Sequence, residues 1–143
     1  MGTLLSTSDS LVSMDHLTFF CTSHQTFKDG SIYRGEWVHG RRQGEGTLTF
    51  KMGRYVGAWE NGMRHGHGVE ELGNGERYEG EWAEGLKQGM GTYFWDNAEV
   101  VMVQYHGEWQ RGCMHGQGKM LATDGDMVIN LFNLKNLRRK YDL

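Results

Sequence analysis

The sequence predicts an all-β protein: an elongated, twisted antiparallel sheet of stacked β-hairpins, with a short C-terminal capping helix. Three observations predict it. The 143 residues include 22 glycines and no proline, and so many glycines would destabilise helices. A six-residue pattern recurs four times, at intervals of 22, 23 and 27 residues. Within each interval, short alternating runs are bounded by turn residues. Strands and turns are therefore favoured over helices.

The repeated pattern is Tyr-x-Gly-x-Trp-x-x-Gly-x-x-x-Gly-x-Gly, and sixteen of the 22 glycines belong to it. Its first three fixed positions are Tyr33, Gly35 and Trp37, then Tyr55, Gly57 and Trp59, then Tyr78, Gly80 and Trp82, then Tyr105, Gly107 and Trp109. Periods of 20 to 50 residues are typical of repeat proteins, in which each copy is one unit that stacks on its neighbours. These twelve residues are the predicted structural core.

Each copy reads as one hairpin. The tyrosine, glycine and tryptophan alternate along the chain, so they share one face of a strand. We expect a large ring from the adjacent repeat to fill the gap over the glycine. Residues 37–44 are expected to form a hairpin loop. Second strands follow at 47–50, 69–72, 92–95 and 119–122. Turns close the units at 51–53, 73–75, 96–98 and 123–125, and Asp29-Gly30 forms the matching turn before the first copy.

The unit resembles the MORN motif (membrane occupation and recognition nexus), over about residues 27–125. Proteins of this family include junctophilins at membrane contacts, plant phosphatidylinositol-phosphate kinases, a SET-domain methyltransferase, radial-spoke head proteins of cilia and small adaptors that bind myosin tails. In the large enzymes the repeats are accessory to another domain. The resemblance therefore implies the hairpin fold, and it implies binding without specifying a partner.

The repeat domain is expected to span residues 19–131, between a loose tail at 1–18 and a capping helix with its tail at 132–143. Residues 17–20 and 26–27 are expected to form half a hairpin before the first copy. A fifth copy decays after residue 125 into a final strand at 126–132, and helical spacing follows over 132–141. A membrane- or partner-docking helix is the alternative there. The apolar stretch 99–104 indicates a longer strand or a bulge, and an exposed sticky edge is the alternative.

Charge and cysteine usage narrow the class of protein. The net charge is −3, with 15 basic and 18 acidic residues, which argues against nucleic-acid binding. Cys21 and Cys113 form neither a disulfide framework nor a metal-ligand spacing, so we expect a reduced, cytoplasmic protein. No apolar run approaches the roughly 18 residues that span a bilayer.

No convincing set of catalytic residues is present, and no cofactor is expected. The histidines fall at repeat positions, and we expect His65, His67 and His115 to be solvated in hairpin loops, not to bind metal. The Gly-x-Gly pairs that end each copy, such as Gly44 and Gly46, lack the strand–loop–helix context of a nucleotide site. The sequence therefore predicts a protein that is not an enzyme.

A series of basic residues is the main candidate for contacts with lipid or partner: Arg41, Arg42, Arg64, Lys87 and Arg111. In predicted loops, such a row would contact anionic headgroups, at about 1 kcal/mol per well-placed cation. A solvated loop edge is the alternative, and the negative net charge favours it. Gly2 lies in Met-Gly-Thr-Leu-Leu-Ser, which fits the N-myristoylation pattern, although one acyl chain binds membranes only marginally.

The leading hypothesis is a non-enzymatic scaffold or adaptor that binds a protein partner, in the cytoplasm and within cytoskeletal or ciliary structures. A peripheral membrane module that reads acidic phospholipids is the second. An accessory fragment of a larger enzyme is the third. Self-association through the two ends of the sheet is the fourth.

Overall fold

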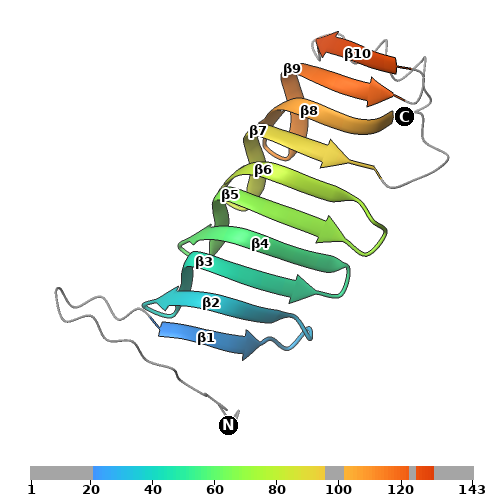
Figure 1. The fold of residues 1–143 in the computed structure, drawn as a ribbon. Coiled ribbons are helices and arrows are strands. Elements are labelled where there is room, and N and C mark those ends of the chain that lie inside the picture. The colour runs from blue at the N-terminus through green and yellow to red at the C-terminus, as the bar shows by residue number, and fades with distance from the viewer. Residues whose placement is uncertain (1–20, 96–101, 123–124, 131–143) are drawn as a thin grey trace.

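A computed structural model of the chain describes residues 21–95, 102–122 and 125–130, and these residues form one antiparallel sheet (Figure 1). The described part contains ten strands: β1 (Cys21–Thr26), β2 (Ile32–Val38), β3 (Arg41–Phe50), β4 (Gly53–Glu60), β5 (Met63–Leu72), β6 (Arg77–Ala83), β7 (Leu86–Phe94), β8 (Met102–Gln110), β9 (Cys113–Ala122) and β10 (Gly125–Asn130). Their order in the sheet is their order in the chain. The predicted stack of hairpins is confirmed.

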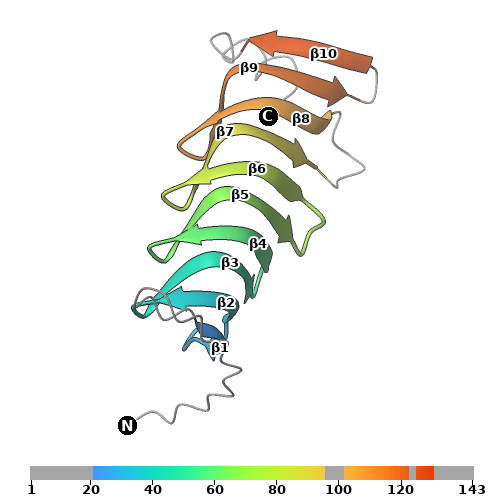
Figure 2. The ribbon, with the colours of Figure 1, turned by 60° about the vertical axis from the view of Figure 1, so that its left-hand side comes forward.

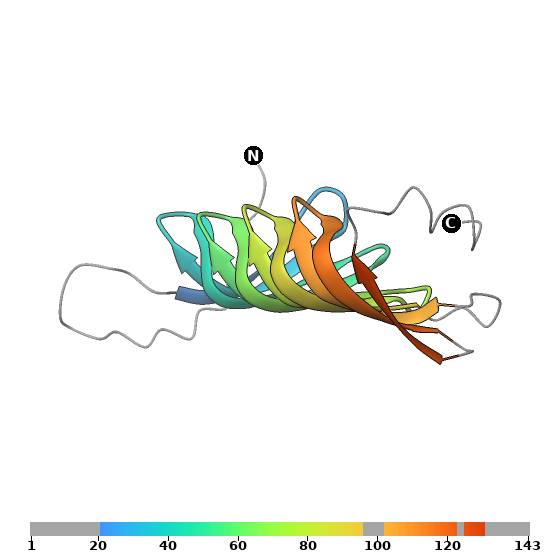
Figure 3. The same ribbon diagram turned by 90° about the horizontal axis from the view of Figure 1, so that it is seen from above.

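The sheet is strongly twisted along its length (Figure 2). Seen from above, the strands are also bent, so the sheet is curved across its width (Figure 3). Each strand pairs with its sequence neighbours, and the described residues form no second layer that covers either face. The curvature of the sheet itself must therefore provide the buried side.

The turn within each hairpin is shorter than the sequence predicts. β2 continues to Val38 and β3 begins at Arg41, which leaves His39-Gly40 as a two-residue turn. Both turn residues have positive φ, 48° and 73°, as a type I′ turn requires. The same backbone recurs at Asn61-Gly62, Glu84-Gly85 and Arg111-Gly112. The expected loop over 37–44 is wrong, because the twist of a type I′ turn matches that of the flanking strands and lets pairing continue.

The second glycine after each tryptophan lies at an irregularity of the ladder. The β2–β3 register shifts between Gly35 and Trp37, and Gly44 has a φ of 62°. A Cβ at Gly44 would collide with the carboxylate of Glu36. This glycine therefore serves a bulged strand and not the loop that the sequence suggested.

The core consists of the aromatic residues of the repeat. The four tyrosines are at most 1% exposed, and Trp59, Trp82 and Trp109 are 4–6% exposed. Rings on a single-layer sheet can be buried to this degree only on its concave side, where neighbouring strands and rings surround them. The predicted core is confirmed for these seven residues, whereas Trp37, in the first copy, is only partly buried.

The glycine of the Tyr-x-Gly-x-Trp run makes room for a ring, but the ring comes from its own repeat. A Cβ on Gly35 would lie 2.6 Å from the hydroxyl of Tyr33 and 2.6 Å from the Cα of Gly46 on β3. Tyr33 also covers Gly46. The expectation of a ring from the adjacent repeat is corrected: the tyrosine folds over the facing glycine pair of its own hairpin.

The ends of the stack agree with the sequence where the structure describes them. β1, at Cys21–Thr26, forms a half-hairpin before the first copy, although the sequence placed it at 17–20 and 26–27, and β10 is the expected final strand. β8 begins at Met102 with a register shift before Gln104, so this part of the stretch 99–104 is a strand with an irregularity. The capping helix at 132–141, the tail at 1–18 and the turns at 96–98 and 123–124 lie outside the described residues.

Candidate functional site on the aromatic face

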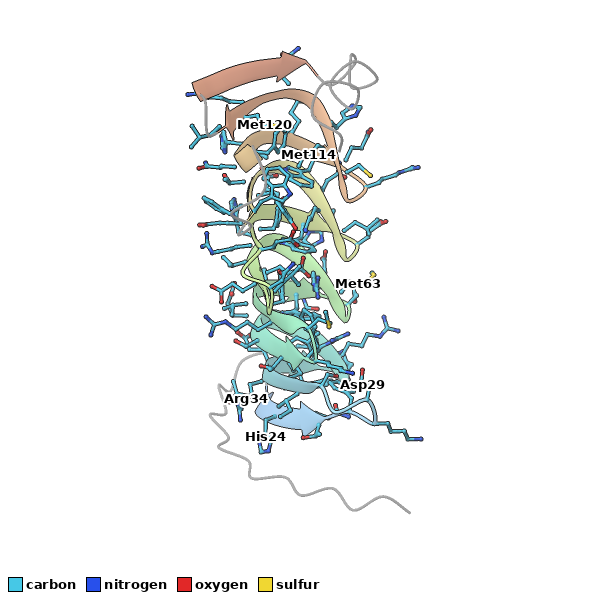
Figure 4. All side chains as sticks on the ribbon, turned by 90° about the vertical axis from the view of Figure 1, so that its right-hand side faces the viewer. His24, Asp29, Arg34, Met63, Met114 and Met120 are labelled. Atoms are coloured by element: carbon cyan, nitrogen blue, oxygen red, sulfur yellow. The ribbon has the colours of Figure 1, made fainter. Side chains whose placement is uncertain are left out.

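The concave side of the sheet carries what we call the aromatic face. It comprises the tyrosines and tryptophans of the four copies and the side chains packed against them, Phe27, Leu48, Phe50, Tyr93, Trp95, Met114 and Met120. Strand alternation places Arg34 on the opposite face, and Figure 4 shows Arg34 and His24 projecting there, while Met63 projects from the hairpin edge.

Tyrosine and tryptophan rings alternate in a ladder of edge-to-face contacts. Tyr33 contacts Trp37 of its own repeat, at 5.1 Å between ring centroids, and Trp59 of the next repeat, at 5.2 Å. The pattern continues from Tyr55 to Trp82 at 5.2 Å. Such pairs add about 0.5–1.5 kcal/mol each beyond their burial. Every inner tryptophan therefore belongs to two repeats.

The polar atoms of these rings reinforce the same connection. The Nε1–H of Trp59 donates to the carbonyl of Gly46, in the preceding repeat, at 3.2 Å. Its counterparts Trp82 and Trp109 donate to Gly68 and Gly91, at 3.2 and 3.1 Å. Each tyrosine hydroxyl donates to a carbonyl three residues along its own strand, as from Tyr33 to Glu36 at 3.2 Å.

Burial strongly favours the protonated form of the tyrosines. It raises the pKa of Tyr33 and of Tyr105 to about 12, and it also raises the pKa of Tyr55 and of Tyr78. In all four cases the leading cause is loss of solvent, which disfavours the phenolate. The hydroxyls are neutral donors near physiological pH, consistent with a structural role.

Three of the five predicted basic residues lie on the aromatic face and not in loops. Arg42, Arg64 and Lys87 stand directly across the ladder from the tryptophans of their own hairpins. The Cζ of Arg42 lies 4.3 Å from the ring centroid of Trp59. The Cζ of Arg64 lies 4.9 Å from that of Tyr55, and the Nζ of Lys87 lies 4.9 Å from that of Tyr78. These are cation–π distances.

The short turns are the reason for this placement, since they draw the predicted loop residues into strands. Arg41 and Arg111 remain exposed near the hairpin edge. The structure therefore does not bring the five cations together as one row: two are on the edge, and three are partly buried among rings.

A single carboxylate, which the sequence did not single out, links two of the three cations. Glu70 accepts from Arg64 at 2.6 Å and lies 3.2 Å from the Nζ of Lys87. All three side chains are at most 20% exposed. Glu70 stands fifteen residues after Tyr55, where the other copies have Leu48, Tyr93 and Met120, so no repeated signal could have revealed it.

A family model described as MORN repeat matches four segments, 33–53, 55–77, 78–98 and 105–127, which together cover more than half of the chain. The chain belongs to the MORN repeat family. No curated protein matched the sequence. The four matched segments begin at the four core tyrosines, so the MORN unit coincides with the ring ladder seen in the structure.

The convex face of the MORN sheet carries a repeated structural contact. The carboxylates of Glu36, Glu81 and Glu108 accept from the backbone amides of Glu45, Met90 and Gln117, at 3.2, 3.0 and 3.0 Å. The second repeat has Ala58 at this position. These glutamates therefore have a structural role, holding the bulged strands that follow each turn.

The remaining chemistry of the described residues is sparse. Within residues 21–95, 102–122 and 125–130, no group of three or more His, Cys, Asp or Glu side chains could hold a metal ion. The same residues include no helix long and apolar enough to cross a membrane. The thiol of Cys113 is free and exposed. His65 lies on β5, 3.3 Å from Glu60. Gly2 lies outside the described part of the chain.

Proposed function

We propose that this MORN protein is a non-enzymatic adaptor, which binds a protein partner on its aromatic face. The observation that carries the proposal is the composition of that face. Above its buried rings it presents partly exposed tyrosine, tryptophan and arginine side chains, among them Tyr93, Trp95 and Arg42. These are the residue types most enriched at binding hot spots.

The outer part of the face is accessible. Phe50, Tyr93 and Trp95 are only partly buried, although they pack against fully buried rings. When a partner covers such partly exposed apolar groups, more of their surface is removed from contact with water. The cytoplasm, in cytoskeletal or ciliary structures, remains the proposed setting.

Site-specific photo-crosslinking in the native cell tests the proposal. A photoreactive phenylalanine analogue replaces Phe50 on the aromatic face in one variant and Val56 in a matched control. Val56 is on the next strand, is 43% exposed and faces the other way. We expect a discrete crosslinked partner at position 50 and not at position 56. Equal labelling at both positions, or none at position 50, would contradict the proposal.

An acidic phospholipid surface is the second candidate, because Arg41 and Arg111 are exposed near the same hairpin edge. Each well-placed cation near such a membrane contributes about 1 kcal/mol. Co-sedimentation with anionic vesicles at physiological salt measures it. Binding that disappears in an Arg41→Gln/Arg111→Gln variant would favour this candidate, and intact-mass analysis of the native protein would report acylation of Gly2.

A further inference from the structure

We propose that the N-terminal end of the aromatic face is a carboxylate-binding site centred on Arg42, and that the partner is a peptide segment presenting Asp or Glu there. The inference rests on the proposed function and names the chemistry of its partner. It is carried by the guanidinium of Arg42 and by a comparison of the first repeat with the second.

Arg42 is held in place, but no carboxylate of the described residues neutralises it. Its Nη2 donates to the carbonyl of Gly62 at 2.7 Å, and its guanidinium stacks on Trp59 and near Tyr33. Among the described residues, no carboxylate forms an ion pair with it. Burial is the main cause that lowers the pKa of Arg42. A partly desolvated cation without an anion is unfavourable, and an incoming carboxylate would relieve this.

The second repeat shows what is missing. Arg64 stands in the same position as Arg42 and contacts Glu70 at 2.6 Å. The residue of the first repeat that corresponds to Glu70 is Leu48. Arg42 thus has the same aromatic setting as Arg64 but lacks the carboxylate, and its remaining N–H donors are available for a bidentate contact.

The indole N–H of Trp37, in the same repeat as Arg42, is also unpaired. The Nε1 of Trp37 is buried and has no hydrogen-bond partner, whereas its three counterparts donate to carbonyls of the preceding repeat. Trp37 lies directly across the ladder from Arg42, and both approach the ring of Tyr33. The first repeat therefore lacks hydrogen-bond and ion-pair partners that the second repeat has.

The rest of the face indicates how the segment would lie. Towards the C-terminal end, the positions equivalent to Arg42 and Leu48 are Met114 and Met120, and Tyr93 and Trp95 lie nearby. The face therefore changes from cationic to apolar along the stack. A segment with an acidic end over the first repeat and apolar residues over the fourth fits it. Arg42 lies among rings on the concave side, which favours a peptide over the surface of a bilayer.

Selection from a phage-displayed library of random dodecapeptides, with the full-length protein as bait, tests the site. We expect the selected peptides to be enriched in Asp or Glu at one end and in apolar residues at the other. Selection on Arg42→Gln should lose the acidic enrichment, and selection on Arg34→Gln, a change on the opposite face of β2, should keep it. Thermal melting of each variant confirms that it is folded.

Leu48→Glu is the sharper variant, because it retains Arg42 and supplies the carboxylate within the chain. We expect it to weaken binding of a selected peptide by roughly 10- to 100-fold, and we expect Glu→Gln in that peptide to do the same. Acidic enrichment that persists on Arg42→Gln, or full affinity in Leu48→Glu, would overturn the site. Apolar peptides without acidic residues would overturn the site and leave the adaptor function standing. Failure to select any peptide, together with Arg42-dependent binding to anionic vesicles, would overturn both.

Discussion

The first and second repeats have the same tyrosine, tryptophan and arginine positions, but these side chains differ in their hydrogen bonds and ion pairs. Trp59 is 4% exposed and donates to Gly46 of the repeat before it, whereas Trp37 is less buried and its indole N–H is unpaired. Arg64 has Glu70 beside it, and Arg42 has Leu48. A MORN tryptophan therefore stabilises the junction with the preceding repeat. The first repeat has no such repeat before it, so its tryptophan lacks this hydrogen bond.

The largest expected effect is that of alkaline pH on stability, because all four repeats bury a tyrosine. The four tyrosines hold their protons to higher pH when folded, since the pKa of unfolded tyrosine is about 10. Their stabilising contribution is complete below about pH 10 and is lost as the pH rises towards about 12 and beyond. We expect the melting temperature to fall steeply there as the four tyrosines ionise.

Circular dichroism melting and tyrosinate absorbance measure the two parts of this prediction. Tyr33→Phe is the matched control, since it removes one of the four buried hydroxyls and should weaken the dependence on alkaline pH. A melting temperature that stays constant from about pH 9 to about pH 12 would show that the hydroxyls are not buried in solution.

Truncating an inner tryptophan should destabilise the fold more than truncating the outer one. Trp59→Ala removes a ring that contacts both Tyr33 and Tyr55 and a hydrogen bond to Gly46, so we expect a loss of about 3–5 kcal/mol. Trp37→Ala should cost about half of that, because its ring has one such partner and no hydrogen bond. Urea unfolding of both variants gives the comparison. Equal losses would mean that the tryptophan does not connect repeats.

Exchanging the residues at the position of Glu70 should make the two repeats resemble each other. Glu70→Leu leaves Arg64 and Lys87 without their shared carboxylate, and we expect a loss of about 1–3 kcal/mol, reduced by partial exposure. Leu48→Glu should be close to neutral, because the new charge finds Arg42. Chemical denaturation at low and high salt measures both. A loss in Leu48→Glu as large as in Glu70→Leu would show that Arg42 cannot be reached from position 48.

The smallest effect concerns the convex face of the second repeat. Ala58→Glu would introduce the carboxylate that the other copies carry, and it should accept from the amide of His67, the counterpart of Glu45. We expect a gain of about 0.5–1 kcal/mol. Glu81→Ala is the reciprocal change and should lose a similar amount, because Met90 loses its acceptor. Circular dichroism melting of both variants measures the two effects. A lower melting temperature for Ala58→Glu than for the unchanged protein would argue against the equivalence of the repeats.

The sequence predicted the hairpins because the pattern that defines them is repeated. Four copies of one spacing are enough to place the core rings and the turns between hairpins at 51–52 and 73–75. The turn inside each hairpin was misjudged, because glycines such as Gly44 mark a bulge as well as a loop. Asn61-Gly62 was the clearest sign of a two-residue turn, but His39, Glu84 and Arg111 are less usual partners for the glycine.

The candidate site was only partly visible in the sequence. The sequence indicates Arg42, Arg64 and Lys87 as a series but places them in loops, because it does not reveal the two-residue turns. Neither Glu70 nor its replacement by Leu48 could be recognised as important, because that position differs in every copy. The indole N–H of Trp37 has no hydrogen-bond partner because no full repeat precedes the first copy. A repeated pattern does not specify what happens at the end of the stack.

The order of the strands also determines how the molecule would respond to force. Every strand is hydrogen-bonded to its sequence neighbours, from β1 to β10, so those bonds run along the line between the two ends of the sheet. Tension applied between the chain termini would load one pair of strands at a time, and the sheet would unzip from its ends. An optical-tweezers recording should then show a series of small steps at low force, whereas a single rip of the whole sheet would show cooperativity beyond neighbouring repeats.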